Sequence, residues 1–496
     1  MNKLLEIEKL SSGLSDKDKD KINSFFSELD KRVELAPLGK NLLISHFINA
    51  FEYYLDQGYS VNKIVKTIDY KHLGSFYMSS SRQFYTLDNA AIIYPLQMKY
   101  GRMPMFRVAA QLKQEIQPAL LQLALDFTIK RFPAFSVIVK RGFFWHYLET
   151  TNSVIQIEEE KDIPCRPMSL LLRSNGSLRV LYYKKRISLE LFHAISDGTG
   201  AMMFLKTLIA QYLRLLGKSI EVDNTILDID EPVDETELVN EFDNAKGDGD
   251  ISTFVDKNSL QLDGKLSELI ISKILHYKMS SKQIKKISKK YGGTVTAYIL
   301  AILYLAARDS ISKTKGMINM QVPVNMRKFN NSKTLRNYSM YFTVGMDIKD
   351  IDDKRRLVEE MDRQIKEKGS QENMNRMMMT TNRLIDIMAY VPMILKNPII
   401  QIVYSYFSNR IICCTLSNLG VIETPKKMQS EIESFMFDYV PGRPNRATAS
   451  LLSYKDSCVL AVIKSNRDDT FERRVYNYLK EDGIDIELEG SVEYES

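Results

Sequence analysis

One histidine of the sequence lies in a setting that suits proton transfer: His193, in the run His193-Ala-Ile-Ser-Asp197-Gly198. An imidazole titrates near neutrality, so a histidine can take a proton from a hydroxyl group at physiological pH. Asp197 is spaced to fix the turn after His193 or to pair with a cation from elsewhere. Gly198 allows the backbone to turn or to approach another segment closely. No Gly-x-Ser-x-Gly motif of a nucleophilic serine occurs, so a histidine here would favour direct transfer of an acyl group over a covalent acyl-enzyme.

The elements on both sides of this run are expected to hold it in place. Residues 187–193 alternate in polarity with a period of two, which predicts a strand that ends at His193. Apolar residues then recur with helical spacing, at Leu205, Leu208, Ile209, Tyr212, Leu213 and Leu216. His193 therefore lies between a strand and a helix, where loops commonly build functional sites on a rigid scaffold. On spacing alone, a histidine that serves only packing remains the alternative.

Three segments in order resemble one known superfamily. The segment around His193 resembles the active-site motif of the chloramphenicol acetyltransferase and condensation-domain superfamily, and it is most similar to bacterial alcohol-acetyltransferase-like members. The run Val322-Pro-Val-Asn325-Met-Arg327 resembles a strand that ends in Pro-x-Asn-x-Arg. The run Leu416-Ser417-Asn418-Leu-Gly resembles the Ser-Asn-Leu-Gly loop. The resemblance covers roughly residues 80–490 and leaves the first 75 residues outside it.

The resemblance implies a role for each matching residue. His193 becomes the general base, and Asp197 becomes a structural aspartate paired with Arg327. Gly198 and Asn325 would support the same loop. By the same resemblance, the reaction takes place in a channel between two lobes, where donor and acceptor approach His193 from opposite sides.

The resemblance also implies substrates and possible carbonyl contacts. Ser417 or Asn418 would polarise the carbonyl of an acyl donor. Acyl-coenzyme A is the expected co-substrate, with an acyl carrier protein as the alternative, and no bound cofactor or metal is expected. The acceptor would be a hydroxyl group on a small or lipid-like molecule.

Two departures narrow the function, and two rival functions remain. Phe192 precedes His193 where peptide-forming condensation domains usually carry a second histidine, so amide synthesis is disfavoured. The Asp-Phe-Gly-Trp-Gly motif of the plant BAHD family is absent, since Trp145 is the only tryptophan. One rival function is carrier-protein-dependent condensation or lipid assembly. The other is a catalytically inactive binding or scaffold protein.

The element pattern predicts an α/β protein with two similar lobes, each a mixed sheet flanked by helices. We expect a helical extension over residues 1–77 and a first acyltransferase lobe over 78–225. A crossover follows over 226–265, where the chain is acidic at its start and lacks helical periodicity. The second lobe is expected over 266–496. The lysine-rich helix predicted from residue 281 to 291 could be a solvated face or an anchor for coenzyme A phosphates.

The composition limits the partners and the compartment. The formal charge of +6 is small beside 68 basic and 62 acidic side chains, so nothing calls for a nucleic-acid partner. The four cysteines show no metal-ligand spacing, and the first ten residues are too charged for a secretory signal. We therefore predict a cytoplasmic protein.

The longest apolar stretch runs from Leu384 to Phe407. Asp386, Lys396 and two prolines interrupt it, which argues against a membrane-spanning helix. We predict a buried helix pair, with a membrane-surface segment as the alternative. Membrane association is thus left open but is not predicted.

Overall fold

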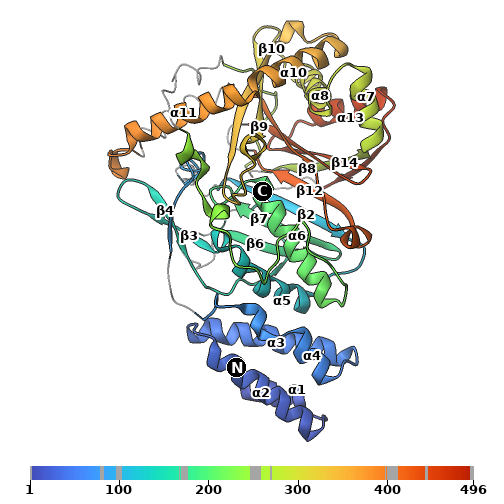
Figure 1. Cartoon of the computed structure of the whole chain (residues 1–496). Helices are drawn as coiled ribbons and strands as arrows, with labels where there is room; N and C mark the ends of the chain where they lie inside the picture. The colour runs from blue at the N-terminus through green and yellow to red at the C-terminus, as the bar shows by residue number, and fades with distance from the viewer. Residues whose placement is uncertain are drawn as a thin grey trace.

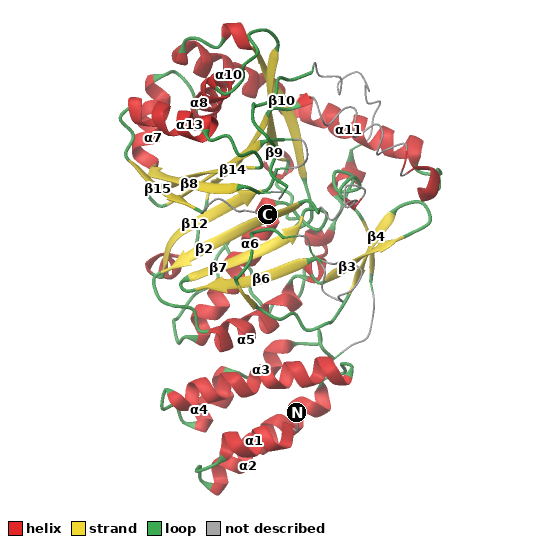
Figure 2. Cartoon of the chain, turned by 180° about the vertical axis from the view of Figure 1, so that it is seen from behind, coloured by secondary structure: helices red, strands yellow, loops and turns green. Residues whose placement is uncertain are grey.

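The computed structural model describes residues 3–78, 83–95, 103–166, 168, 177–245, 258–268, 271–396, 398, 411–441 and 445–491. These residues form a mixed α/β protein in three tiers. A helical tier lies at one end, a five-stranded sheet in the middle and a seven-stranded sheet at the other end (Figure 1). The view from behind shows helices beside both large sheets, as the sequence predicts (Figure 2).

The helical tier is joined to the first lobe by one continuous core. Phe47 of the tier lies 6.0 Å from the ring of Phe127, which belongs to α5 (Pro118–Thr128). His46 Nδ1 lies 2.7 Å from a carboxylate oxygen of Asp126 in the same helix, and both side chains are buried. The extension therefore covers an apolar face of the first lobe. Its helices are α1 (Lys3–Ser11), α2 (Asp16–Arg32), α3 (Pro37–Asp56) and α4 (Val61–Thr67).

The first lobe is built on a five-stranded sheet in the order β12-β2-β7-β6-β5. Ile187, Leu189 and Leu191 of β7 are fully buried, as the sequence predicts, but Ser188 and Glu190 on the other face are buried as well. The strands are β2 (Met105–Leu112), β5 (Glu158–Glu159), β6 (Leu178–Tyr183), β7 (Arg186–Phe192) and β12 (Ile432–Tyr439), and α6 (Gly198–Leu215) follows β7. A small sheet, β1-β4-β3, lies beside it, made of β1 (Phe84–Thr86), β3 (Val137–Arg141) and β4 (His146–Thr150).

The β12 strand corrects the predicted division at residue 266. By sequence it belongs to the second lobe, yet it pairs antiparallel with β2, from Ile432 beside Leu112 to Tyr439 beside Phe106. Strand pairing depends on which edge of a sheet a segment reaches, and local sequence pattern does not encode that choice. The first sheet is therefore completed by a strand from the later part of the chain.

The second lobe is built on a seven-stranded sheet in the order β10-β9-β11-β13-β14-β8-β15. Its α8 helix is buried along residues 297–307, which explains its almost wholly apolar sequence. The strands are β8 (Lys273–Ser280), β9 (Met317–Asn325), β10 (Ser339–Asp347), β11 (Cys414–Val421), β13 (Ala447–Tyr454), β14 (Ser457–Lys464) and β15 (Ile486–Gly490). The helices are α7 (Ser281–Lys290), α8 (Val295–Asp309), α9 (Arg327–Asn330), α10 (Lys354–Lys368), α11 (Gln371–Met388) and α13 (Thr470–Glu481).

Over its described residues, the apolar stretch from Leu384 is not buried as the sequence predicts. Residues 397 and 399–407 lie outside the described part of the chain. Over 384–396, Tyr390 is 87% exposed and Ile394 is 75% exposed, so the prediction of burial is wrong for this segment. Hydrophobic composition predicted burial here, but α11 starts beside the edge strand β10 and extends away from the sheet, so its far end is left at the surface (Figure 1). Within the described residues, no single helix is long and apolar enough to cross a membrane; by length and composition alone, the bent pair α7 and α8 could.

Candidate active site

His193 follows the last residue of β7 and lies at the junction of the two halves of the molecule. Its backbone N–H donates to the carbonyl of Pro104, 2.9 Å away, which continues the pairing between β7 and β2 by one residue. Ile195 N–H then donates to the carbonyl of Phe192, which closes a tight turn. The strand therefore fixes the backbone of His193 before α6 begins.

Asp197 links the start of α6 to the second half of the chain. One carboxylate oxygen accepts the backbone N–H groups of Thr199 and Gly200 at 3.1 Å each, which caps the helix. The other oxygen accepts from the Arg327 guanidinium at 2.7 Å and from the Tyr338 N–H at 2.9 Å. The ion pair predicted between Asp197 and Arg327 is therefore present, and both side chains are largely buried.

Arg327 is held by more than its aspartate partner. Its guanidinium also donates to the carbonyls of Thr334 and Arg336, at 2.7 and 2.6 Å. Asn325, predicted as a supporting residue, accepts from the Arg327 guanidinium at 3.1 Å and donates to the Thr199 hydroxyl at 3.2 Å. The Pro-x-Asn-x-Arg run thus contacts the start of α6 through two side chains.

Gly198 allows the His193 loop to pack closely against β11 without displacing a leucine side chain. A Cβ atom at this position would lie 2.6 Å from a side-chain methyl of Leu419 in β11. The absence of a side chain therefore brings the His193 loop against the Ser-Asn-Leu-Gly run.

Ser417 and Asn418 lie in that run, but no hydrogen bond joins either side chain to His193. The Asn418 amide donates to the Thr296 hydroxyl at 2.9 Å and accepts the Gly420 N–H at 2.8 Å, so both of its polar atoms hold local structure. Ser417 is largely buried on β11. Their part in polarising a carbonyl stays a prediction.

Aromatic rings surround the imidazole of His193. Tyr94 stacks on it with centroids 4.7 Å apart and planes inclined by 17°. Phe106 of β2 meets it edge-on at 5.0 Å, and Tyr439 at the end of β12 does so at 5.9 Å. The ring is thus confined on several sides by apolar surface.

Asn337 was missed by the sequence analysis, although it makes the closest polar contact to His193. Its side-chain Nδ2 donates to the His193 carbonyl at 2.8 Å and lies 3.2 Å from Nδ1 of the ring. Because a carbonyl oxygen only accepts, the amide nitrogen must face it, and the Ser339 hydroxyl donates to Asn337 Oδ1 at 2.8 Å on the other side. Asn337 lies 144 residues from His193 in the sequence and outside the three motifs, so no sequence signal pointed to it.

Asp88 and Arg336 form a second buried pair behind Asn337. The Asp88 carboxylate lies 3.1 Å from the Arg336 guanidinium and accepts the Asn337 N–H at 3.1 Å. Burial raises the pKa of Asp88 to about 7, and Arg336 opposes the shift. The segment 336–338 is therefore fixed on one side by Asp88 and on the other by Asp197.

Electrostatics favour the neutral form of His193. Burial lowers its pKa below the ordinary value of 6.5, and backbone hydrogen bonds at His193 and Ser196, with the charge of Asp197, oppose the shift. Burial and the charge of Arg141 also lower the pKa of His146 on β4, to about 4, so it is the contacts around His193 that distinguish it. A neutral imidazole can accept a proton, as a general base must.

Comparison with solved structures identifies the overall fold. The chain is similar to TRI3 trichothecene 15-O-acetyltransferase from Fusarium sporotrichioides, with a TM-score of 0.54 and 14% identity over 82% of this chain and 96% of that chain. It is equally similar, with a TM-score of 0.54, to the first condensation domain of the CDA synthetase, at 11% identity over 82% and 99% of the two chains. The chain has the chloramphenicol acetyltransferase-like fold.

A third neighbour with this fold was solved with ligands. It is TRI101 of F. sporotrichioides in complex with coenzyme A and T-2, with a TM-score of 0.54 and 10% identity over 82% of this chain and 99% of that chain. By sequence, no protein-family model and no curated protein matches. At these identities the likeness establishes the fold alone.

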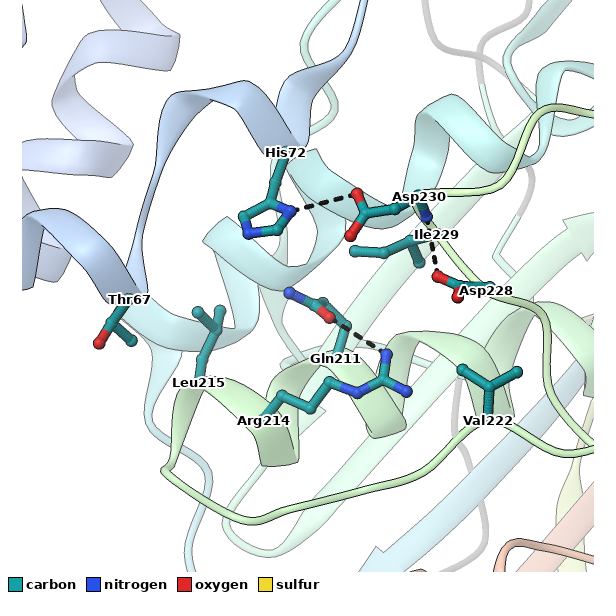
Figure 3. Close-up of a pocket in the computed structure, with 9 residues that line it drawn as sticks. All are labelled: Thr67, His72, Gln211, Arg214, Leu215, Val222, Asp228, Ile229 and Asp230. Carbon is teal, nitrogen blue, oxygen red and sulfur yellow. Dashed lines mark hydrogen bonds and ion pairs between the residues drawn. The ribbon is translucent and has the colours of Figure 1, made fainter.

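One described cavity of this chloramphenicol acetyltransferase-like fold, of about 240 Å³, lies away from His193. It opens where the helical extension meets the far end of α6, about 20 Å along the helix from Gly198 at about 1.5 Å per residue. Its polar wall is already paired: His72 points to Asp230, and Arg214 to Gln211 (Figure 3). We therefore do not assign it to the site around His193. Its lining residues are Thr67, His72, Gln211, Arg214, Leu215, Val222, Asp228, Ile229 and Asp230.

Proposed function

We propose that the protein is an acyltransferase that moves an acyl group from acyl-coenzyme A to a hydroxyl acceptor, with His193 as the general base. The observation that carries this proposal is a histidine with a depressed pKa, fixed by contacts from both halves of the chain. The fold supports it, because solved neighbours include acetyltransferases. Alcohol-acetyltransferase-like specificity is part of the proposal.

The proposed reaction is a direct transfer. In the proposed reaction the neutral ring carries its hydrogen on Nδ1, where a backbone hydrogen bond at His193 holds it, so Nε2 is the ring nitrogen that receives the acceptor's hydroxyl proton. The acceptor oxygen then forms a bond to the thioester carbonyl carbon, and the resulting tetrahedral intermediate loses the coenzyme A sulfur as the C–S bond breaks. The imidazolium returns its proton to the departing thiolate. The two products, an ester and free coenzyme A, then leave, and His193 is neutral again.

The other residues act by position in this proposal. Asp197 and Arg327 hold the turn that carries His193, and Asn325 and Gly198 bring that turn against the second lobe. Ser417 or Asn418 would stabilise the oxyanion, Asn418 only after its hydrogen bonds to Thr296 and Gly420 change.

The donor has two candidates. The exposed lysines of α7 fit either solvation or an anchor for coenzyme A phosphates. Condensation domains among the neighbours make a carrier protein the second candidate, although Phe192 replaces the second histidine usual in those domains. We propose a small-molecule or lipid-like acceptor and a cytoplasmic location; the four buried, unpaired cysteines fit a reducing compartment.

The test is an assay for free thiol with acetyl-coenzyme A and a panel of alcohols. We expect His193→Ala to lower turnover by roughly two to four orders of magnitude while circular dichroism stays unchanged. The matched control is His72→Ala, because His72 lies in the remote polar cavity. Full activity in folded His193→Ala protein would refute the base assignment. Thiol release from an acyl carrier protein only, or from neither donor, would favour one of the two rival functions instead.

A further inference from the structure

An apolar surface on the side of the molecule has no part in the proposed reaction. We call it the apolar rim. Phe143 is 70% exposed, Tyr390 87% and Ile394 75%, whereas large apolar side chains are usually covered. The rim is made by the tip of the β3–β4 hairpin, by the last turn of α11 and by the chain after α11, at Phe143, Phe144, Ile387, Tyr390, Ile394 and Leu395.

Direct contacts join the two segments, so the rim is preformed. The Met393 N–H donates to the Phe143 carbonyl at 2.9 Å. The Lys396 ammonium donates to the Phe144 carbonyl at 2.8 Å and lies 3.1 Å from the ring centroid of Trp145. A backbone hydrogen bond and a covered lysine thus hold two segments that are distant in the sequence side by side, with their apolar side chains exposed.

Basic side chains accompany the rim. Residues 137–150 and 380–396 contain three basic side chains that are not covered, Lys140, Arg141 and Arg383, against one exposed acidic side chain, Asp386; Lys396 and Glu149 are buried. Lys140 and Arg141 belong to the hairpin and form no ion pair with any residue that the structure describes. The partner that fits such a surface is apolar in its interior and negatively charged at its edge.

An anionic lipid surface meets both conditions better than a second copy of the chain. In a twofold dimer the same patch meets itself, so the basic side chains of one copy would face a patch that is itself basic and offers them few acidic partners. A lipid surface instead takes phenylalanine, tyrosine and tryptophan at the level of its headgroups and attracts the basic residues.

We propose that the apolar rim binds the surface of a membrane that contains anionic lipid, so that the protein docks on the bilayer without spanning it. The side chains of Phe143 and Ile394 enter the headgroup region, and Lys140 and Arg141 contact lipid phosphates. This binding does not depend on the proposed reaction.

The test is co-sedimentation of the full chain with phosphatidylcholine vesicles, with and without phosphatidylglycerol. We expect binding to the vesicles that contain phosphatidylglycerol, and at least about tenfold weaker partition for Phe143→Ser/Ile394→Ser, because two large apolar side chains no longer leave water. Lys140→Glu/Arg141→Glu should remove the preference for phosphatidylglycerol. Trp145, the only tryptophan, should be quenched by brominated lipid in the wild-type protein.

Three controls make the result specific to the rim. Leu38→Ser removes an equally exposed apolar side chain from the extension, and Lys285→Glu/Lys286→Glu removes charge from α7; both should bind like the wild type. His193→Ala should also bind, which separates this proposal from the proposed function. Three results would each overturn the proposal. The wild type does not bind vesicles; the α7 variant or the Leu38 variant loses binding while the rim variants keep it; or the wild type is a dimer that Phe143→Ser/Ile394→Ser dissociates.

Discussion

Replacing Asp197 with asparagine removes its ion pair with Arg327 and keeps its role as the N-cap of α6. The asparagine Oδ1 can still accept the N–H groups of Thr199 and Gly200 that begin α6. Its amide nitrogen then occupies the place of the oxygen that accepts from Arg327 and Tyr338, so donors face donors. Arg327→Met removes the other partner and leaves Asp197 as a buried carboxylate.

The structure gives the size of the effect. The Asp197 and Arg327 side chains are only 6% and 10% exposed and their atoms are 2.7 Å apart, so water screens the pair weakly. Breaking a buried pair by removing one partner destabilises a protein by about 3–5 kcal/mol, and a single variant here should fall in that range. The double variant buries no unpaired charge of this pair, so we expect its destabilisation to fall short of the sum by about 2–3 kcal/mol.

Urea denaturation followed by circular dichroism measures the three variants against the wild type. Turnover should fall by about a hundredfold in Asp197→Asn, because the turn that carries His193 loses its tie to the second half of the chain. If the two single effects add to within about 0.5 kcal/mol, the pair is not coupled and the structural argument fails. Wild-type turnover in Asp197→Asn would equally refute the positioning role.

The remaining predictions concern proton transfer and the extension. The neutral form of His193 is favoured because burial lowers its pKa, so kcat/KM should stay level at neutral pH and fall only as pH drops below 6.5; a plateau ending above 6.5 would contradict this. Asn337→Asp places a carboxylate beside Nδ1 and should move the acid limb of the kcat/KM profile upward by about one pH unit. Asn337→Ala should lower kcat without that shift. Identical pH profiles for the two variants would mean that Asn337 has a purely structural role. A truncation that starts near residue 79 should keep His193-dependent transfer in its soluble fraction, because no described extension residue contacts His193. It should unfold at a lower temperature and aggregate, because the extension residues that pack on Phe127 and Asp126 are gone. Thermal unfolding and turnover test this, and a well-folded but inactive truncation would place the extension in the active site.

Most elements could be predicted from the sequence because their signals are local. The alternation in β7 and the helical spacing in α6 placed His193 at a strand-to-helix junction, and the structure confirms both elements. The Asp197–Arg327 pair could be predicted from ordered motifs, since both residues lie in runs that resemble a known superfamily. These predictions depend on short-range periodicity or on the resemblance of short motifs to a known superfamily.

What the sequence could not supply was the identity of distant neighbours. Tyr94 and Asn337 reach His193 from segments without a motif, and β12 pairs with a sheet whose other strands come from the first half of the chain. Apolar composition after Leu384 predicted burial, yet whether a side chain is covered depends on which other segment lies over it. Local patterning thus determined the elements and the motif of this protein. Only tertiary packing decided what surrounds His193 and which apolar residues stay at the surface, because those contacts join residues that are far apart in the chain.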